Sequence, residues 1–325
     1  MAWWISSWNG GRPDAGGRGF SNLPRMFSQP KQPATTMART TPHPIRCADG
    51  FELHATLHSP EGPVRGVVLM HPATAMSASM YFAFAARLTD DGFAVVTYNY
   101  RGVHPSGVAK RTRAGFLTWA DQDVDAVTRW AAEHFPGLPL LAVGHSFGGH
   151  AIGLSASSQR LTAAVMVATQ AGSLRFIRSL RERMLVAMYL KFIGPLCARF
   201  LGYMPYARLG MGEDVPAQAT LEWSRWASMP RFYFDDPHVD AEARLRRPHM
   251  PVLSIGLDDD PWAPPEAIDL VCEHLTGCTV ARQQFSPADS AGQGICHLGF
   301  FREHHAATLW PTVIDWLRRH APERG

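Results

Sequence analysis

The chain has 325 residues, of which 46% are hydrophobic, and this composition excludes a disordered or fibrous protein. Its formal net charge of +3 is too small to indicate a nucleic-acid partner, and no basic run with interleaved aromatic side chains occurs. At this length we expect one α/β domain that carries an insertion.

The cysteines are odd in number and irregularly spaced, which argues against a disulfide framework and a structural zinc site. Reduced thiols predict a cytoplasmic protein, and we expect neither a metal nor another cofactor. The five cysteines are Cys47, Cys197, Cys272, Cys278 and Cys296.

The first 41 residues differ from the rest of the chain. They are rich in Gly, Pro, Ser and Arg, contain one acidic residue, Asp14, and show no apolar period, so we predict a disordered extension over 1–41. The apolar run at 3–5 is too short for a signal peptide or a membrane span.

From residue 45 strands and helices alternate. A hairpin is expected around Asp49-Gly50, because short alternating stretches at 45–48 and 51–58 flank a favourable turn. Such an order predicts a mostly parallel sheet with helices on both faces, and ligands at the carboxyl ends of the strands. Further strands are expected at 66–70, 93–98, 138–143, 163–169, 252–256 and 279–285, and helices at 79–91, 119–134, 264–275 and 306–320.

The alternation breaks at 173–247, a helical stretch rich in Leu, Phe, Met and Trp. We interpret it as a helical cap inserted between two parts of the core, 42–172 and 248–325. The apolar run 184–201 has the composition of a membrane helix, but Lys191, Arg199 and the Gly194-Pro195 break argue against a span. We predict no membrane span.

The run LLAVGHSFGG at 140–149 is the most informative feature of the chain. It matches the G-x-S-x-G nucleophile elbow, in which a serine sits on a strained turn between strand and helix. The glycines on either side are required because a Cβ would collide where the two backbones approach. Ser146 is the predicted nucleophile.

A serine nucleophile needs a base, a group that orients the base, and donors for the oxyanion. In this context the acid and then the histidine follow in the chain. Three carboxylates come directly after the strand at 252–256; we favour Asp260 and keep Asp259 as the alternative acid. His297 stands between glycines just before the last helix and is the predicted base.

Two backbone N–H groups are candidates for the oxyanion hole. Phe147 opens the helix after the elbow, where N–H groups and the helix dipole favour an anion. The second donor should follow the strand at 66–70. Pro72 has no N–H, so we predict that Ala73 donates.

These residues resemble the α/β-hydrolase fold superfamily, and within it the bacterial branch of predicted hydrolases related to serine aminopeptidases. The resemblance implies an eight-stranded core, a helical cap and a Ser146–Asp260–His297 triad. One departure is the extra acid after Gly256, which keeps Asp259 in consideration. The similarity rests on YNYRG at 98–102, GHSFGG at 144–149, RLGMGEDVP at 208–216, FYFDD at 232–236, DDPWAP at 259–264 and HLGFFR at 297–302.

We therefore predict a serine hydrolase that cleaves a carboxylic ester, thioester or amide through an acyl-enzyme on Ser146. The apolar cap predicts a small-molecule substrate with an apolar acyl or aryl group. An acyltransferase on the same triad and a non-catalytic ligand-binding protein are the alternatives. The oligomeric state is left open.

Overall fold

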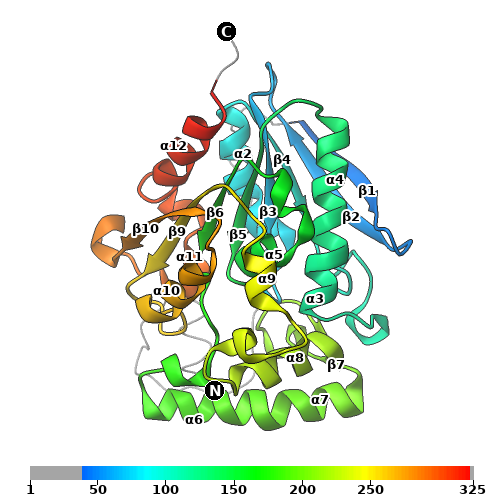
Figure 1. Cartoon of the computed structure of the whole chain (residues 1–325), viewed down its shortest axis with the longest axis vertical. Coiled ribbons are helices and arrows are strands. Elements are labelled where there is room, and N and C mark those ends of the chain that lie inside the picture. The colour runs from blue at the N-terminus through cyan, green and yellow to red at the C-terminus, as the bar shows by residue number, and fades with distance from the viewer. Residues whose placement is uncertain (1–38, 323–325) are drawn as a thin grey trace, which may run out of the picture.

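The computed structural model describes residues 39–322 of the chain. Eight strands form one sheet in the order β1-β2-β4-β3-β5-β6-β9-β10 (Figure 1). β2 runs antiparallel to both neighbours, and every pair from β4 to β10 is parallel, which confirms the predicted mostly parallel sheet. The strands are β1 (Arg39–Arg46), β2 (Glu52–Ser59), β3 (Gly66–His71), β4 (Phe93–Tyr98), β5 (Leu140–His145), β6 (Ala163–Val167), β9 (Pro251–Leu257) and β10 (Thr279–Phe285).

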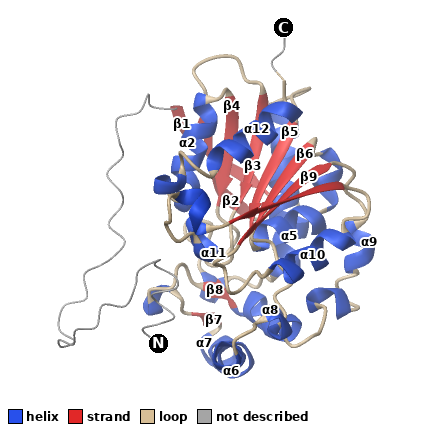
Figure 2. Cartoon of the chain, turned by 90° about the vertical axis from the view of Figure 1, so that its left-hand side faces the viewer, coloured by secondary structure: helices blue, strands red, loops and turns tan. Residues whose placement is uncertain are grey.

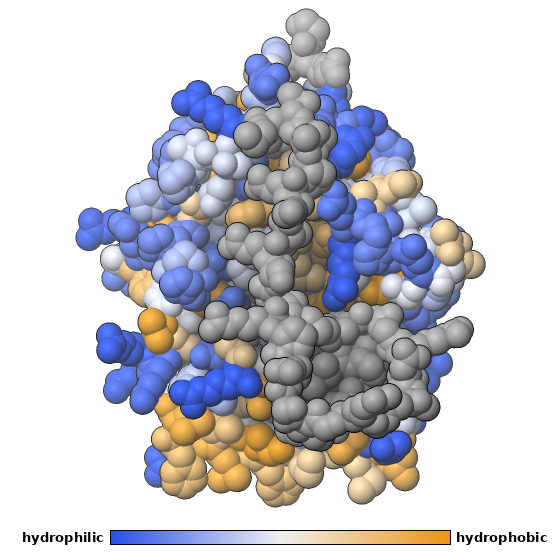
Figure 3. Space-filling model, turned by 180° about the vertical axis from the view of Figure 1, so that it is seen from behind, coloured by the Kyte–Doolittle hydropathy of each residue, from blue (hydrophilic) through white to orange (hydrophobic). Residues whose placement is uncertain are grey.

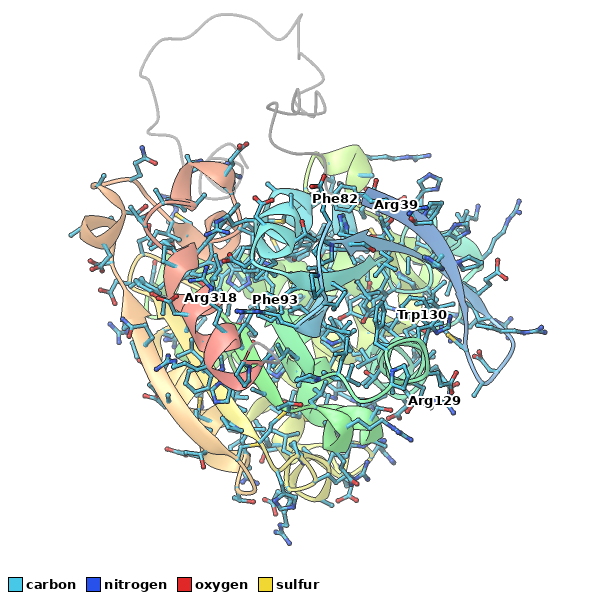
Figure 4. The ribbon with its side chains drawn as sticks, turned by 90° about the horizontal axis from the view of Figure 1, so that it is seen from above. Arg39, Phe82, Phe93, Arg129, Trp130 and Arg318 are labelled. Carbon is cyan, nitrogen blue, oxygen red and sulfur yellow. The ribbon has the colours of Figure 1, made fainter. Side chains whose placement is uncertain are left out.

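Helices cover both faces of the sheet. Figure 2 shows the strands as a central layer, and in the view from above α2 and α12 lie on one side with α4 and α5 on the other (Figure 4). All residues of β3, β4 and β5 are buried, as expected for strands covered on both faces. The helices of these layers are α2 (Phe82–Asp90), α4 (Asp125–His134), α5 (Phe147–Leu154), α10 (Pro265–His274) and α12 (Trp310–His320).

The first strand is longer than the sequence predicts. β1 begins at Arg39, so the expected boundary of a disordered extension at residue 41 is wrong, and the rest of that prediction lies outside the described residues. Pro42 and Pro44 conceal the strand in the sequence. Both are tolerated because β1 is an edge strand and the two prolines alternate, so their missing N–H groups fall on the side without a partner.

The closing helix is shorter than expected. α12 begins at Trp310 instead of residue 306, with Pro311 in its first turn. Proline is favoured there because its missing N–H would have no helical partner. A separate 3-10 turn, Glu303–His305, precedes it.

Residues 174–245 are here called the α6–α9 segment. Its helices α6, α7 and α8 lie beyond the carboxyl ends of the parallel strands, whereas α9 lies beside α5 (Figure 1). α6 and α7 form one continuous rod at the end of the molecule, joined by a π-helical turn, Tyr189–Ile193. Pro195 lacks the N–H that an α-helix would use, and the π turn lets the rod continue past it. The elements of the segment and the remaining short ones are α3 (Phe116–Thr118), α6 (Leu180–Met188), α7 (Gly194–Leu201), β7 (Tyr203–Met204), β8 (Val215–Pro216), α8 (Ala217–Ala227), α9 (Ala241–Leu245) and α11 (Cys296–Gly299).

Within residues 39–322, one helix is long and apolar enough to cross a membrane: Leu180–Leu201, with 22 residues and a mean hydropathy of 1.5. Of its most apolar stretch, 17% is buried inside the protein. The expected absence of a membrane span therefore stays a prediction.

Candidate active site

Ser146 lies at the sharp turn between β5 and α5. Its backbone has φ +52° and ψ −116°, a conformation that L-residues rarely adopt. A Cβ on Gly144 would strike the backbone of Gly149, and one on Gly148 would strike the carbonyl of His71. The two glycines are thus required for the turn that holds the serine at the carboxyl end of β5.

Three side chains from distant parts of the chain meet here. His297 Nε2 lies 3.0 Å from Ser146 Oγ, and His297 Nδ1 lies 2.6 Å from Asp260 Oδ2. An ionised carboxylate only accepts hydrogen bonds, so Nδ1 carries the proton and Nε2 is left to accept from the hydroxyl. The other carboxylate oxygen, Asp260 Oδ1, accepts the N–H groups of Trp262 and Ala263 at 2.9 and 3.3 Å.

Asp259, the alternative acid expected from the sequence, does not bind the imidazole of His297. It binds the backbone just before that residue. Its two oxygens accept the N–H groups of Ile295 and Cys296 at 2.7 and 2.9 Å. The structure therefore brings Asp260 to His297, while Asp259 fixes the turn from which His297 projects. Adjacent acids divide these tasks because successive side chains point in different directions.

Behind the elbow, a chain of hydrogen bonds links the two loops that face Ser146. His145 Nε2 lies 2.8 Å from the carbonyl of His297, which can only accept, so Nε2 carries the proton. His145 Nδ1 must then accept from the Tyr81 hydroxyl at 2.9 Å, and burial lowers the pKa of His145 to about 3, which keeps it neutral. Tyr81 Oη in turn accepts the Ala73 N–H at 2.9 Å.

This network includes one of the two predicted oxyanion donors, the Ala73 N–H. Ala73 and Phe147 both line the pocket beside Ser146. The Phe147 N–H opens α5, where the first amides of a helix have no helical acceptor. The Ala73 N–H, in contrast, already donates to Tyr81, so it reaches a substrate oxygen only by sharing or exchanging that bond. Tyr81 lies within the helix expected at 79–91, and the sequence pattern did not reveal the role of its hydroxyl.

The pocket above Ser146 is apolar and uncharged. It holds about 1110 Å³ of empty space, its open mouth included, and the described residues that line it include no Asp, Glu, Lys or Arg. His150 lines it too, and burial lowers its pKa to about 4, so this ring is neutral at pH 7. The α6–α9 segment contributes much of the apolar wall, notably Ile177, Val186, Leu190, Trp223, Trp226 and Phe232.

Neither a metal cluster nor a disulfide is present in the part of the chain that the structure describes. There, no three His, Cys, Asp or Glu side chains are grouped so that they could hold a metal ion, and all five cysteines are free thiols. The expected independence from cofactors stays a prediction.

Known proteins show the same fold. The family model described as "Alpha/beta hydrolase family" matches residues 67–307. Phospholipase ABHD3 of Mus musculus is 25% identical over 297 residues, which cover 85% of this chain and 68% of that protein.

Two solved structures support the fold. A soluble variant of monoglyceride lipase from Saccharomyces cerevisiae, in complex with a substrate analogue, matches with a TM-score of 0.67 and 15% identity over 91% of this chain and 99% of that one. A thermostable carboxyl esterase from Bacillus coagulans matches with a TM-score of 0.58 and 17% identity over 88% and 100%. With its sheet, its elbow and a family match over most of its length, this chain belongs to the alpha/beta hydrolase family.

Proposed function

We propose that the protein is a serine hydrolase that cleaves a carboxylic ester of an apolar acyl group through an acyl-enzyme on Ser146. The observation that carries this proposal is the continuous hydrogen-bonded chain from Ser146 Oγ through His297 to Asp260, at the floor of an apolar pocket. Nucleophile, base and orienting acid are the three parts that acyl transfer needs.

In the first half-reaction His297 Nε2 takes the Ser146 hydroxyl proton as Oγ attacks the ester carbonyl. The tetrahedral oxyanion is stabilised by the Phe147 N–H, and by the Ala73 N–H once it turns from Tyr81 or shares its proton. His297 then gives the proton to the departing alcohol, leaving the acyl group on Ser146. Water, activated by the same imidazole, releases the acid and restores the serine.

The substrate class follows from the pocket and the relatives. The uncharged lining favours an apolar acyl group, and the α6–α9 segment acts as the cap that covers it. Because the relatives are named as a phospholipase, a monoglyceride lipase and a carboxyl esterase, we favour an ester over a thioester or an amide. Membership of the branch related to serine aminopeptidases stays a prediction, as does a cytoplasmic location.

A fluorophosphonate probe tests the nucleophile. The wild-type protein should be labelled stoichiometrically on Ser146, and Ser146→Ala should lose labelling together with at least about 10³-fold of its activity on p-nitrophenyl butyrate. Ser173 lines the same pocket, so Ser173→Ala is the matched control and should still be labelled. Labelling that persists in Ser146→Ala contradicts the proposal.

A further inference from the structure

A stripe of large apolar side chains covers the outward side of the rod formed by α6 and α7. Its members stand four residues apart, a spacing that places successive side chains next to each other on a helix surface. They are exposed by between 49% and 78%, and we call them the outer stripe: Leu180, Met184, Met188, Phe192, Leu196 and Phe200.

The opposite side of the same rod is also apolar, but it is covered. Val186 and Leu190 line the pocket above Ser146. Gly194 lies against α8, where a Cβ would come within 3.1 Å of Thr220, and Ala198 is buried. A surface helix of a globular protein normally presents a polar outward face, so a rod that is apolar on both sides has an outer partner.

The outer stripe forms one continuous region. Figures 1 and 2 place α6 and α7 in a line at the end of the molecule remote from α12, and Figure 3 shows hydrophobic side chains gathered over that end. Hydrophilic side chains lie beside and above them in the same view. The outer stripe is therefore part of an apolar surface at this end of the molecule, bordered by polar side chains.

The charges around the stripe are mostly positive. Between residues 174 and 201 the chain has six Arg or Lys residues and one acid, Glu182, and one of the six, Arg178, forms an ion pair with Glu266. Arg181, Lys191 and Arg199 are exposed on the rod itself. A second copy of the chain on a two-fold axis would bring like charges together, whereas an anionic lipid surface complements them.

We propose that the outer stripe docks on the surface of an anionic phospholipid bilayer, with the rod lying in the plane of the interface. Apolar side chains enter the boundary between headgroups and acyl chains, while the flanking cations bind the headgroups. The rod does not cross the membrane in this arrangement, because Leu190, Gly194 and Ala198 stay packed on the rest of the protein.

Docking also specifies how the substrate arrives, a step that rests on the proposed function. The inner side of the rod forms part of the wall of the pocket that holds Ser146. Docking would therefore hold the pocket about one helix diameter from the bilayer surface, which favours a substrate that resides there. The proposed substrate class is an amphiphilic lipid ester that resides in the membrane.

Vesicle flotation tests the docking without any turnover. Ser146→Ala protein is mixed with phosphatidylcholine vesicles, either pure or containing about 30% phosphatidylglycerol, and we expect it to float with the anionic vesicles, less so at high salt. Adding Phe192→Asp and Phe200→Asp should lower the vesicle-bound fraction at least about tenfold. Phe82→Asp is the matched control: Phe82 is an exposed aromatic residue on α2, and its loss should leave flotation intact.

Equal flotation of the parent and the Phe192→Asp/Phe200→Asp protein, or no flotation of the parent, overturns the docking. Sedimentation velocity that finds a parent dimer, abolished by the two aspartates, together with no vesicle binding, assigns the stripe to a second copy and also overturns it. The same substitutions in the Ser146 protein should leave p-nitrophenyl butyrate hydrolysis unchanged. That assay reports on the catalytic chemistry separately, so a failure of docking and a failure of the proposed function are distinguishable.

Discussion

At the scale of single residues, the site joins Ser146 and His297 to one of two adjacent acids, Asp260, while Asp259 binds backbone N–H groups nearby. Ser146 and His297 stood out because the elbow and the order of the chain restrict the choice. Asp259 and Asp260 are adjacent, and only the rotation of the turn after β9 decides which one reaches the imidazole. The Tyr81–His145 link was out of reach, because it depends on how the loop after β3 folds against the elbow.

Asp260→Asn and Asp259→Asn separate the two acids. We expect Asp260→Asn to lower kcat by about 10³–10⁴-fold, because an amide no longer holds the imidazole tautomer that can accept the serine proton. Asp259→Asn should lower kcat by no more than about tenfold, since one of the two N–H bonds that fix the turn is lost. Steady-state kinetics on p-nitrophenyl butyrate measures both, and losses in the reverse order contradict the assignment.

Tyr81→Phe tests the positioning network. Removing the hydroxyl deletes the acceptor for the Ala73 N–H and the donor to His145 Nδ1. We expect kcat to fall about tenfold with KM nearly unchanged, because the loop and the imidazole are less well fixed while the pocket keeps its shape. A rise in kcat would mean instead that Tyr81 withholds the Ala73 N–H from the substrate.

At the scale of elements, the alternation of apolar strands and amphipathic helices was sufficient for the sheet. Both β4, a continuous apolar run, and β10, a partly exposed edge strand, were predicted at their observed bounds. The errors arose at prolines, which normally interrupt strands and helices but are tolerated at an edge strand and in the first turn of a helix. Pro42 and Pro44 therefore hid the start of β1, and α12 begins next to Pro311, later than expected. The course of the chain through the α6–α9 segment could not be predicted, because several of its helices line the pocket instead of packing on the sheet.

Two glycines of α5 should respond oppositely to alanine. At Gly148 a Cβ meets the His71 carbonyl, so Gly148→Ala should cost at least about 1–3 kcal/mol in free energy of unfolding. At Gly153 a Cβ lies 3.4 Å from Leu245, an ordinary contact. Because alanine is the better helix former, Gly153→Ala should add about 0.5–1 kcal/mol. Urea denaturation measures the free energy of unfolding of both variants. Equal values would contradict the close approach of Gly148 to the His71 carbonyl.

At the scale of the whole molecule, buried neutral histidines make the fold sensitive to acid. Burial lowers the pKa of His58, His71, His145 and His150 from 6.5 to between about 3 and about 4. In the unfolded chain these groups take up protons below pH 6.5, whereas in the folded chain they stay neutral until pH 4. The free energy of unfolding must therefore fall as the pH drops from about 6.5 to about 4.

Each of these histidines should contribute a slope of about 1.4 kcal/mol per pH unit near pH 5. Urea denaturation at a series of pH values should yield an uptake of about four protons on unfolding from these groups. His58→Gln, remote from Ser146, should lower the uptake by about one, since glutamine keeps a polar partner for Thr97 without titrating. A free energy of unfolding that is constant between pH 6.5 and pH 5 would mean that these histidines are not kept neutral by burial.

The proposed function requires that an acyl group is carried by Ser146 during turnover. Acid quenching during steady-state hydrolysis of p-nitrophenyl butyrate, followed by peptide mass spectrometry, measures this intermediate directly. We expect a butyryl adduct on the peptide that contains Ser146 in the wild-type protein, and no adduct in Ser146→Ala. Continued turnover with an adduct on another residue, or with no adduct under conditions where the second half-reaction limits the rate, would contradict it.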